Sequence, residues 1–68
     1  MKLSARNVLK GRILGIDKGS VTSPVQLDIG GMTITSSITN EAVEELGLKI
    51  GIDAYAVIKA SDVMVAVD

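Results

Sequence analysis

The chain contains neither cysteine nor histidine in its 68 residues, and this sets the first limit on how it can fold. A domain of this size buries only about 60% of the surface that its unfolded chain exposes, so its core alone is marginal. Small domains usually compensate with disulfides, a structural metal, oligomerisation or unusually good packing. Without thiolates and imidazoles, disulfides and bound zinc, copper or iron are excluded. We therefore predict one domain, residues 1–68, that self-associates and holds no free metal cation.

The apolar content supports self-association. Hydrophobic residues make up 47% of the chain, and a monomer would have to expose many of them. The net charge of -1 gives no general attraction to nucleic acid or to an anionic membrane. The first residues, which include Lys2 and Arg6, contain no apolar stretch long enough for a signal peptide or a membrane span. We expect a cytoplasmic protein with neither nucleic-acid nor membrane partners.

Glycines and polar clusters divide the sequence into short segments, which is typical of an all-β domain. Strands are predicted at residues 8–16, 25–29, 32–38, 54–59 and 63–67, the first of them bent at its glycines. Residues 25–29 alternate apolar and polar side chains, the pattern of a half-buried strand. The last segment is apolar on both faces, so we expect another subunit to cover its second face.

A short helix is predicted at residues 40–47, between the third and fourth strands. Thr39 or Asn40 is suited to the N-cap and Gly47 to the C-cap. Three strands, a short helix and two further strands form the order of a five-stranded OB-like barrel. The predicted fold class is therefore all-β, with this barrel as its architecture.

Three polar clusters stand at the ends of the predicted elements, and all of them offer hydrogen-bond donors. They are residues 4–7, residues 35–39 and residues 59–61. A tetrahedral dianion needs several N–H and O–H donors and one or two positive charges to replace its hydration shell, and Arg6 and Lys59 would supply the charge. The clusters contain no carboxylate, which favours molybdate, tungstate or sulfate over hydrogen phosphate, whose proton needs an acceptor.

Four segments in order resemble the molbindins, the Mop or molybdate-pterin-binding family, whose unit is a single TOBE or OB-like domain. They are residues 4–7 before a glycine-bearing first strand, residues 34–39, residues 43–47 and residues 57–64. The resemblance covers essentially the whole chain. It implies a hexamer built as a trimer of dimers, which holds molybdate or tungstate at subunit interfaces for intracellular molybdenum storage and homeostasis.

The resemblance also implies which residues contact the oxyanion. The predicted molybdate-binding residues are Ser4, Ala5, Arg6, Asn7, Ser36, Thr39, Lys59, Ala60 (through its backbone N–H) and Ser61. Within residues 35–39 the assignment of Ser36 and Thr39 is looser, since Thr35 and Ser37 are equally able donors and strand alternation sends only one set inward.

Structural roles compete with each of these assignments. Arg6 could instead form a surface ion pair with Glu44. Thr39 could be the helix N-cap without contacting a ligand, and residues 59–61 could form a turn without contacting one. Two other functions also compete: a regulatory or structural oligomerisation module, and a nucleic-acid-binding OB module, which usually needs aromatic stacking platforms in a basic groove. Catalysis is not expected, because no nucleophile and base pair can be assembled without histidine or cysteine.

Overall fold

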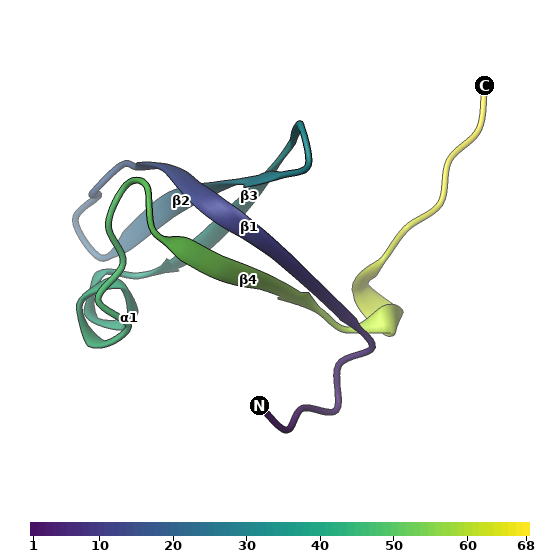
Figure 1. The fold of residues 1–68 in the computed structure, drawn as a ribbon, viewed down its shortest axis with the longest axis horizontal. Coiled ribbons are helices and arrows are strands. Elements are labelled where there is room, and N and C mark those ends of the chain that lie inside the picture. Colours follow the sequence, from purple (N-terminus) through teal and green to yellow (C-terminus); the bar gives the residue numbers. More distant parts are fainter.

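The structure is a computed structural model that describes residues 1–68. It contains β1 (Asn7–Ile16), β2 (Thr22–Ile29), β3 (Met32–Thr39), α1 (Asn40–Glu45), β4 (Asp53–Ile58) and a 3₁₀ turn at Ala60–Asp62. The strands form one antiparallel sheet in the order β3-β2-β1-β4 (Figure 1). Four predicted strands and the helix are thus confirmed, with bounds shifted by a few residues.

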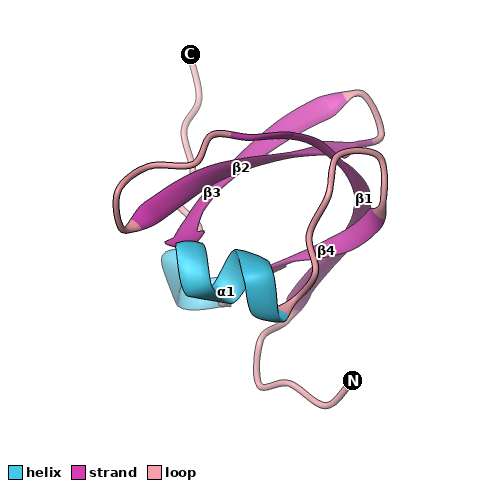
Figure 2. Cartoon of the chain, turned by 90° about the vertical axis from the view of Figure 1, so that its left-hand side faces the viewer, coloured by secondary structure: helices cyan, strands magenta, loops and turns pink.

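The sheet curls into a half-barrel because β1 bends (Figure 2). The register between β1 and β2 shifts between Ile13 and Gly15, which confirms the bend expected at the glycines. Gly11 permits close approach of the strands, since a Cβ there would lie 2.4 Å from the backbone oxygen of Asp28. Long β1 pairs with β2 at one end and with β4 at the other, so it holds both halves of the curled sheet together.

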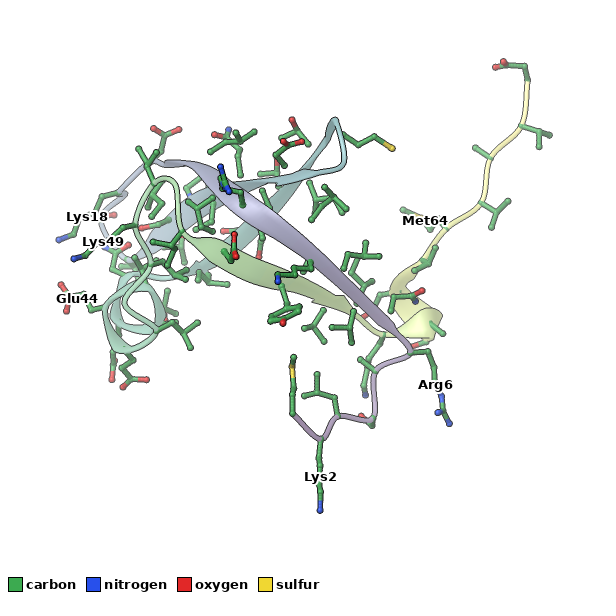
Figure 3. The ribbon with its side chains drawn as sticks, viewed as in Figure 1. Lys2, Arg6, Lys18, Glu44, Lys49 and Met64 are labelled. Atoms are coloured by element: carbon green, nitrogen blue, oxygen red, sulfur yellow. The ribbon has the colours of Figure 1, made fainter.

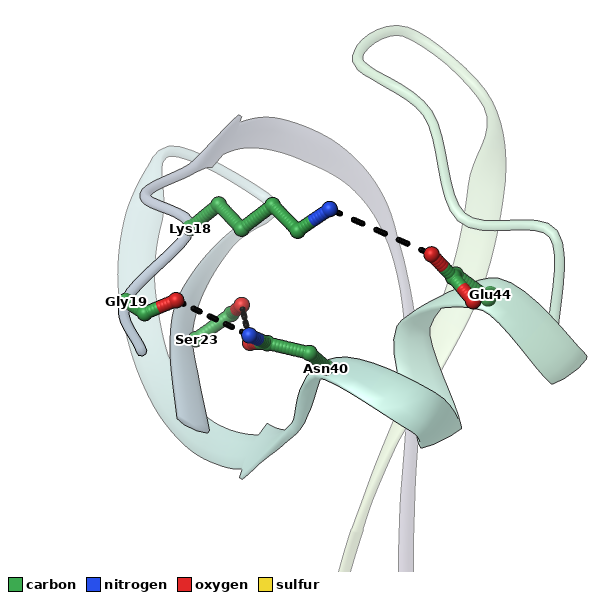
Figure 4. Close-up of polar contacts among 5 residues, drawn as sticks. All are labelled: Lys18, Gly19, Ser23, Asn40 and Glu44. Atoms are coloured by element: carbon green, nitrogen blue, oxygen red, sulfur yellow. Dashed lines mark hydrogen bonds and ion pairs between the residues drawn. The ribbon is translucent and has the colours of Figure 1, made fainter. Parts of the chain in front are cut away.

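The helix α1 is fixed at one end of the half-barrel by polar contacts (Figure 4). Thr39 accepts a hydrogen bond from the backbone N–H of Ala42, at 3.1 Å, and is the N-cap. The side chain of Asn40 donates to the Gly19 carbonyl at 2.9 Å and accepts a hydrogen bond from the buried Ser23 hydroxyl. These bonds attach the start of the helix to the loop between β1 and β2 and to the first residues of β2.

The core is small. Its buried apolar side chains are Ile13, Val25, Leu27 and Ala56, which come from β1, β2 and β4. The accessible surface is 5352 Å², whereas a compact monomer of 7.1 kDa is expected to expose roughly 4,100 Å². The chain therefore exposes about 1,300 Å² more than a compact monomer of its mass.

The predicted fifth strand and the closed barrel are not found in the single chain. Residues 63–68 pair with no strand, and they lead away from the sheet toward a distant C-terminus (Figure 1). The 3₁₀ turn redirects the chain after β4. Residues 63–67, whose apolar alternation predicted a strand, therefore lie away from the edges of their own sheet. Neither this turn nor the six-residue α1 is long enough to cross a bilayer.

Candidate functional site

Two of the three polar clusters meet at the end of the sheet where β1 begins and β4 ends. Asn7 pairs with Ile58, and its side-chain amide donates a hydrogen bond of 3.2 Å to the Ile58 carbonyl. This contact spans 51 positions of sequence and joins the residue at the end of one cluster to the residue just before the other. The structure therefore puts Asn7, with the predicted residues Ser4, Ala5 and Arg6 that precede it, at the same end of the sheet as Lys59, Ala60 and Ser61, which follow β4.

The charge at this end is positive and unpaired. Neither Arg6 nor Lys59 forms an ion pair, and the competing Arg6–Glu44 pair does not exist. Glu44 instead lies 3.9 Å from the ammonium group of Lys18, beside α1 (Figure 4). Arg6 and Lys2 both extend into solvent (Figure 3), so Lys2 is a further free cation that was not among the predicted site residues. Its position two residues before Ser4 is the signal that could have identified it.

The 3₁₀ turn adds backbone donors. Its own hydrogen bonds are donated by Asp62 to the Lys59 carbonyl, at 2.9 Å, and by Val63 to the Ala60 carbonyl, at 3.3 Å. No side chain caps the start of the turn, so the first N–H groups have no partner within it. Residues with backbone, hydroxyl, ammonium and guanidinium donors thus lie at the same end of the sheet. The carboxylate nearest in sequence is that of Asp62, which is exposed.

The third cluster lies at the other end of the molecule. Thr39 ends β3 and leads into α1, which is opposite the 3₁₀ turn (Figure 1). Ser36 is half-buried on the inner face of β3, while Thr39 is exposed and caps the helix. The helix start also carries Glu41, which disfavours an anion there. One chain alone does not bring Ser36 and Thr39 together with Arg6 and Lys59.

Replacing Thr39 with alanine is expected to lower the free energy of unfolding by about 1 kcal/mol, because the Ala42 N–H loses its capping partner. Urea denaturation followed by circular dichroism measures this change. Thr33→Ala is the matched control, since Thr33 is an exposed threonine of the same strand with no side-chain hydrogen bond. Equal stability of the two variants would show that the cap contributes nothing.

The largest hollow of the molecule does not suit an ion. It has a volume of about 540 Å³, and 14 of its 17 lining residues are hydrophobic. An unpaired charge would lose its hydration there without compensation. No group of three or more aspartate, glutamate, histidine or cysteine side chains is placed to hold a metal ion. The exposed cationic end is therefore the better candidate site.

Comparison with known proteins gives a consistent result over nearly the whole chain. The model of the TOBE domain matches residues 3–65. The probable molybdenum-pterin-binding protein of Haemophilus influenzae is 52% identical over 69 residues, with 100% of both chains covered. These matches extend across both of the clusters that meet at the cationic end.

Solved structures agree in fold as well as in sequence. MopII from Clostridium pasteurianum superimposes with a TM-score of 0.91 at 51% identity, covering 97% of this chain and 100% of that one. The cytoplasmic molybdate-binding protein ModG, in a crystal form with molybdate bound, gives a TM-score of 0.90 at 54% identity. That match covers 94% of this chain and 46% of the ModG chain.

Proposed function

This chain belongs to the TOBE-domain family, and within it to the molybdenum-pterin-binding proteins, and from that membership we propose that it binds molybdate or tungstate reversibly without catalysing a reaction. The observation that carries the proposal is the pairing of Asn7 with Ile58, which puts residues 4–7 and residues 59–61 at one end of the sheet, where Arg6 and Lys59 form no ion pair. Molybdate bound in the similar ModG supports the choice of ligand.

The proposed contacts follow from the chemistry of a tetrahedral dianion. The guanidinium of Arg6 can donate two parallel hydrogen bonds to the oxyanion, whereas Lys59 acts as a point charge. Ser4 and Ser61 offer hydroxyl donors, Asn7 offers an amide, and Ala5 and Ala60 offer backbone N–H groups. A set without a carboxylate favours an anion that carries no proton, because the proton of hydrogen phosphate is best held by a charged acceptor.

We place the complete site between subunits. In one chain Ser36 and Thr39 lie at the opposite end from Arg6, so all the predicted ligands could contact one anion only if a second copy contributed part of the set. The 1,300 Å² of surface beyond that of a compact monomer supports association, since a standard interface buries about 800 Å² per partner. The proposed assembly is a hexamer formed as a trimer of dimers.

The proposed biological role is storage and homeostasis of molybdenum in the cytoplasm. A bound oxyanion held by hydrogen bonds and charge is released when its free concentration falls, which suits a buffer. The cytoplasmic protein ModG supports this location. No nucleic-acid role is proposed, because Tyr55 is the single aromatic residue and cannot form the series of stacking platforms that such a surface uses.

Isothermal titration calorimetry with sodium molybdate and sodium tungstate is expected to show saturable binding to the purified protein. Sodium sulfate tests whether the site selects large oxyanions, and sodium phosphate tests the need for a fully ionised anion. We expect weaker binding of sulfate and no saturable binding of phosphate. Absence of heat and of retained molybdenum after dialysis, measured by elemental analysis, would reject the proposed function.

A further inference from the structure

Asn7 differs from the other predicted site residues because its side chain is already bound within the chain. Its amide nitrogen donates to the Ile58 carbonyl at 3.2 Å, and no other side-chain hydrogen bond connects the two clusters at the cationic end. Asn7 is half-buried, whereas its neighbour Arg6 is exposed and extends into solvent (Figure 3). The Asn7 amide is thus engaged at the sheet, while the guanidinium of Arg6 is free.

Few contacts connect the two donor-bearing segments to each other. The pairing of β1 with β4 ends at Asn7 and Ile58, and beyond these residues the segments leave the sheet in different directions (Figure 1). Residues 1–6 form no hydrogen bond and no ion pair. The hydrogen bonds of residues 59–61 stay within the 3₁₀ turn. The last strand pair and the Asn7 side chain are therefore what connects the segments where they leave the sheet.

We propose that Asn7 is a positioning residue of the oxyanion site, which holds the two donor-bearing segments together at the sheet through Ile58 and does not itself contact the anion. This rests on the proposed function and gives a different role to one residue that was predicted as a ligand. A bond that exists before the anion arrives reduces the conformational freedom that binding must remove, and this raises the affinity. Turning the amide toward the anion would instead leave the Ile58 carbonyl without this donor.

The chemistry of the asparagine amide agrees with this role. The amide carries an acceptor oxygen next to its donor nitrogen, whereas the side chains of Arg6 and Lys59 carry donors alone. A backbone carbonyl is complementary to the amide nitrogen, but a dianion repels the amide oxygen. The bond to Ile58 uses the nitrogen, so the structure shows Asn7 with the partner that suits it better.

Replacing Asn7 with alanine is expected to weaken molybdate binding by about 2- to 12-fold, the factor that corresponds to the net contribution of one intramolecular hydrogen bond. Calorimetric titration measures the affinity, and circular dichroism checks that the variant is folded. Unchanged affinity in the folded variant would overturn the positioning role, because a merely structural asparagine would affect stability alone. A wild type that binds no molybdate would instead reject the proposed function, so the two failures are distinguishable.

A disulfide separates positioning from direct contact, because it can connect the two strands but cannot donate a hydrogen bond to an anion. Asn7 and Ile58 are partners in an antiparallel pair, in which opposite Cα atoms lie about 4.5–5.5 Å apart, within the range that disulfides bridge. The chain has no cysteine of its own. The variant with Asn7→Cys and Ile58→Cys is titrated with tungstate in its oxidised form and after reduction. The oxidised form is expected to bind about 2- to 12-fold more tightly than the reduced form.

Arg12→Cys combined with Asp53→Cys is the matched control, since these residues are partners at the other end of the same pair of strands. Its affinity for tungstate should be equal in the oxidised and reduced forms. Equal affinity of the two forms of the Asn7→Cys and Ile58→Cys variant would overturn the positioning role. An equal gain in the control pair would overturn it too, because any connection between β1 and β4 would then have the same effect.

Discussion

Replacing Arg6 with alanine is expected to weaken molybdate binding by about 10- to 150-fold, because a hydrogen bond to a charged group contributes about 1.5–3 kcal/mol. Arg6 forms no ion pair and extends into solvent just before β1, so its removal leaves the packing of the sheet unchanged. Calorimetric titration measures the affinity, and circular dichroism checks that the variant remains folded. Arg6→Lys should bind at an intermediate level, since lysine keeps the charge but not the planar donor pair.

Arg12→Ala is the control for this experiment, because it removes the same charge from β1, the strand that directly follows Arg6. Arg12 lies 3.9 Å from Asp53 on the outer face of the sheet, where an exposed ion pair contributes at most about 1 kcal/mol to stability. The affinity of the Arg12→Ala variant for molybdate should equal that of the wild type. A matching loss in both variants would indicate a diffuse charge effect, and full affinity in Arg6→Ala would remove Arg6 from the proposed site.

Strands in which apolar and polar side chains alternate could be predicted from the sequence. Val25 and Leu27 are predicted to face inward by their period of two, and both are buried in the core. The helix start was also predictable, because Thr39 acts locally: its hydroxyl reaches an N–H only three residues away. Local chemistry determines these features, and no distant contact is needed to establish them.

The fifth strand shows where local patterns stop being sufficient. Residues 63–67 have the apolar alternation of a strand, yet strand propensity does not specify which edge, or which copy of the chain, supplies the partner. The apolar character of both faces predicted a covering subunit, and the exposure of Val65 and Val67 is consistent with that expectation. The predicted closed barrel was wrong for a single chain, because closing it needs a fifth strand and residues 63–68 of the same chain lead away from the sheet.

For a similar reason, only part of the geometry of the candidate site could be predicted from the sequence. The meeting of Asn7 with Ile58 depends on the register of β1 and β4, which no sequence spacing reveals. The separation of Ser36 from Thr39 could have been foreseen, since residues three apart on a strand face opposite sides. Whether Ser36 and Thr39 contact the anion stays a prediction, and it depends on how the copies assemble.

Replacing Ile13 with alanine is expected to cost about 2–5 kcal/mol, the range for truncating a large buried aliphatic side chain. Ile13 is 1% exposed and belongs to a core that has only four buried apolar residues. A chain of 68 residues is stabilised by roughly 3–10 kcal/mol in total. The cavity therefore removes a large part of the stability, and the urea midpoint should fall steeply or the variant should be unfolded at 25 °C.

Leu14→Ala is the matched control, because Leu14 is the next residue of β1 and is 48% exposed. It should cost less than about 1 kcal/mol, since a half-exposed side chain loses less buried area and leaves no enclosed cavity. The comparison is made at equal protein concentration, because association stabilises the folded state by mass action. A loss at Ile13 no greater than that at Leu14 would mean that this core does not hold the half-barrel together, and that stability resides in contacts between copies.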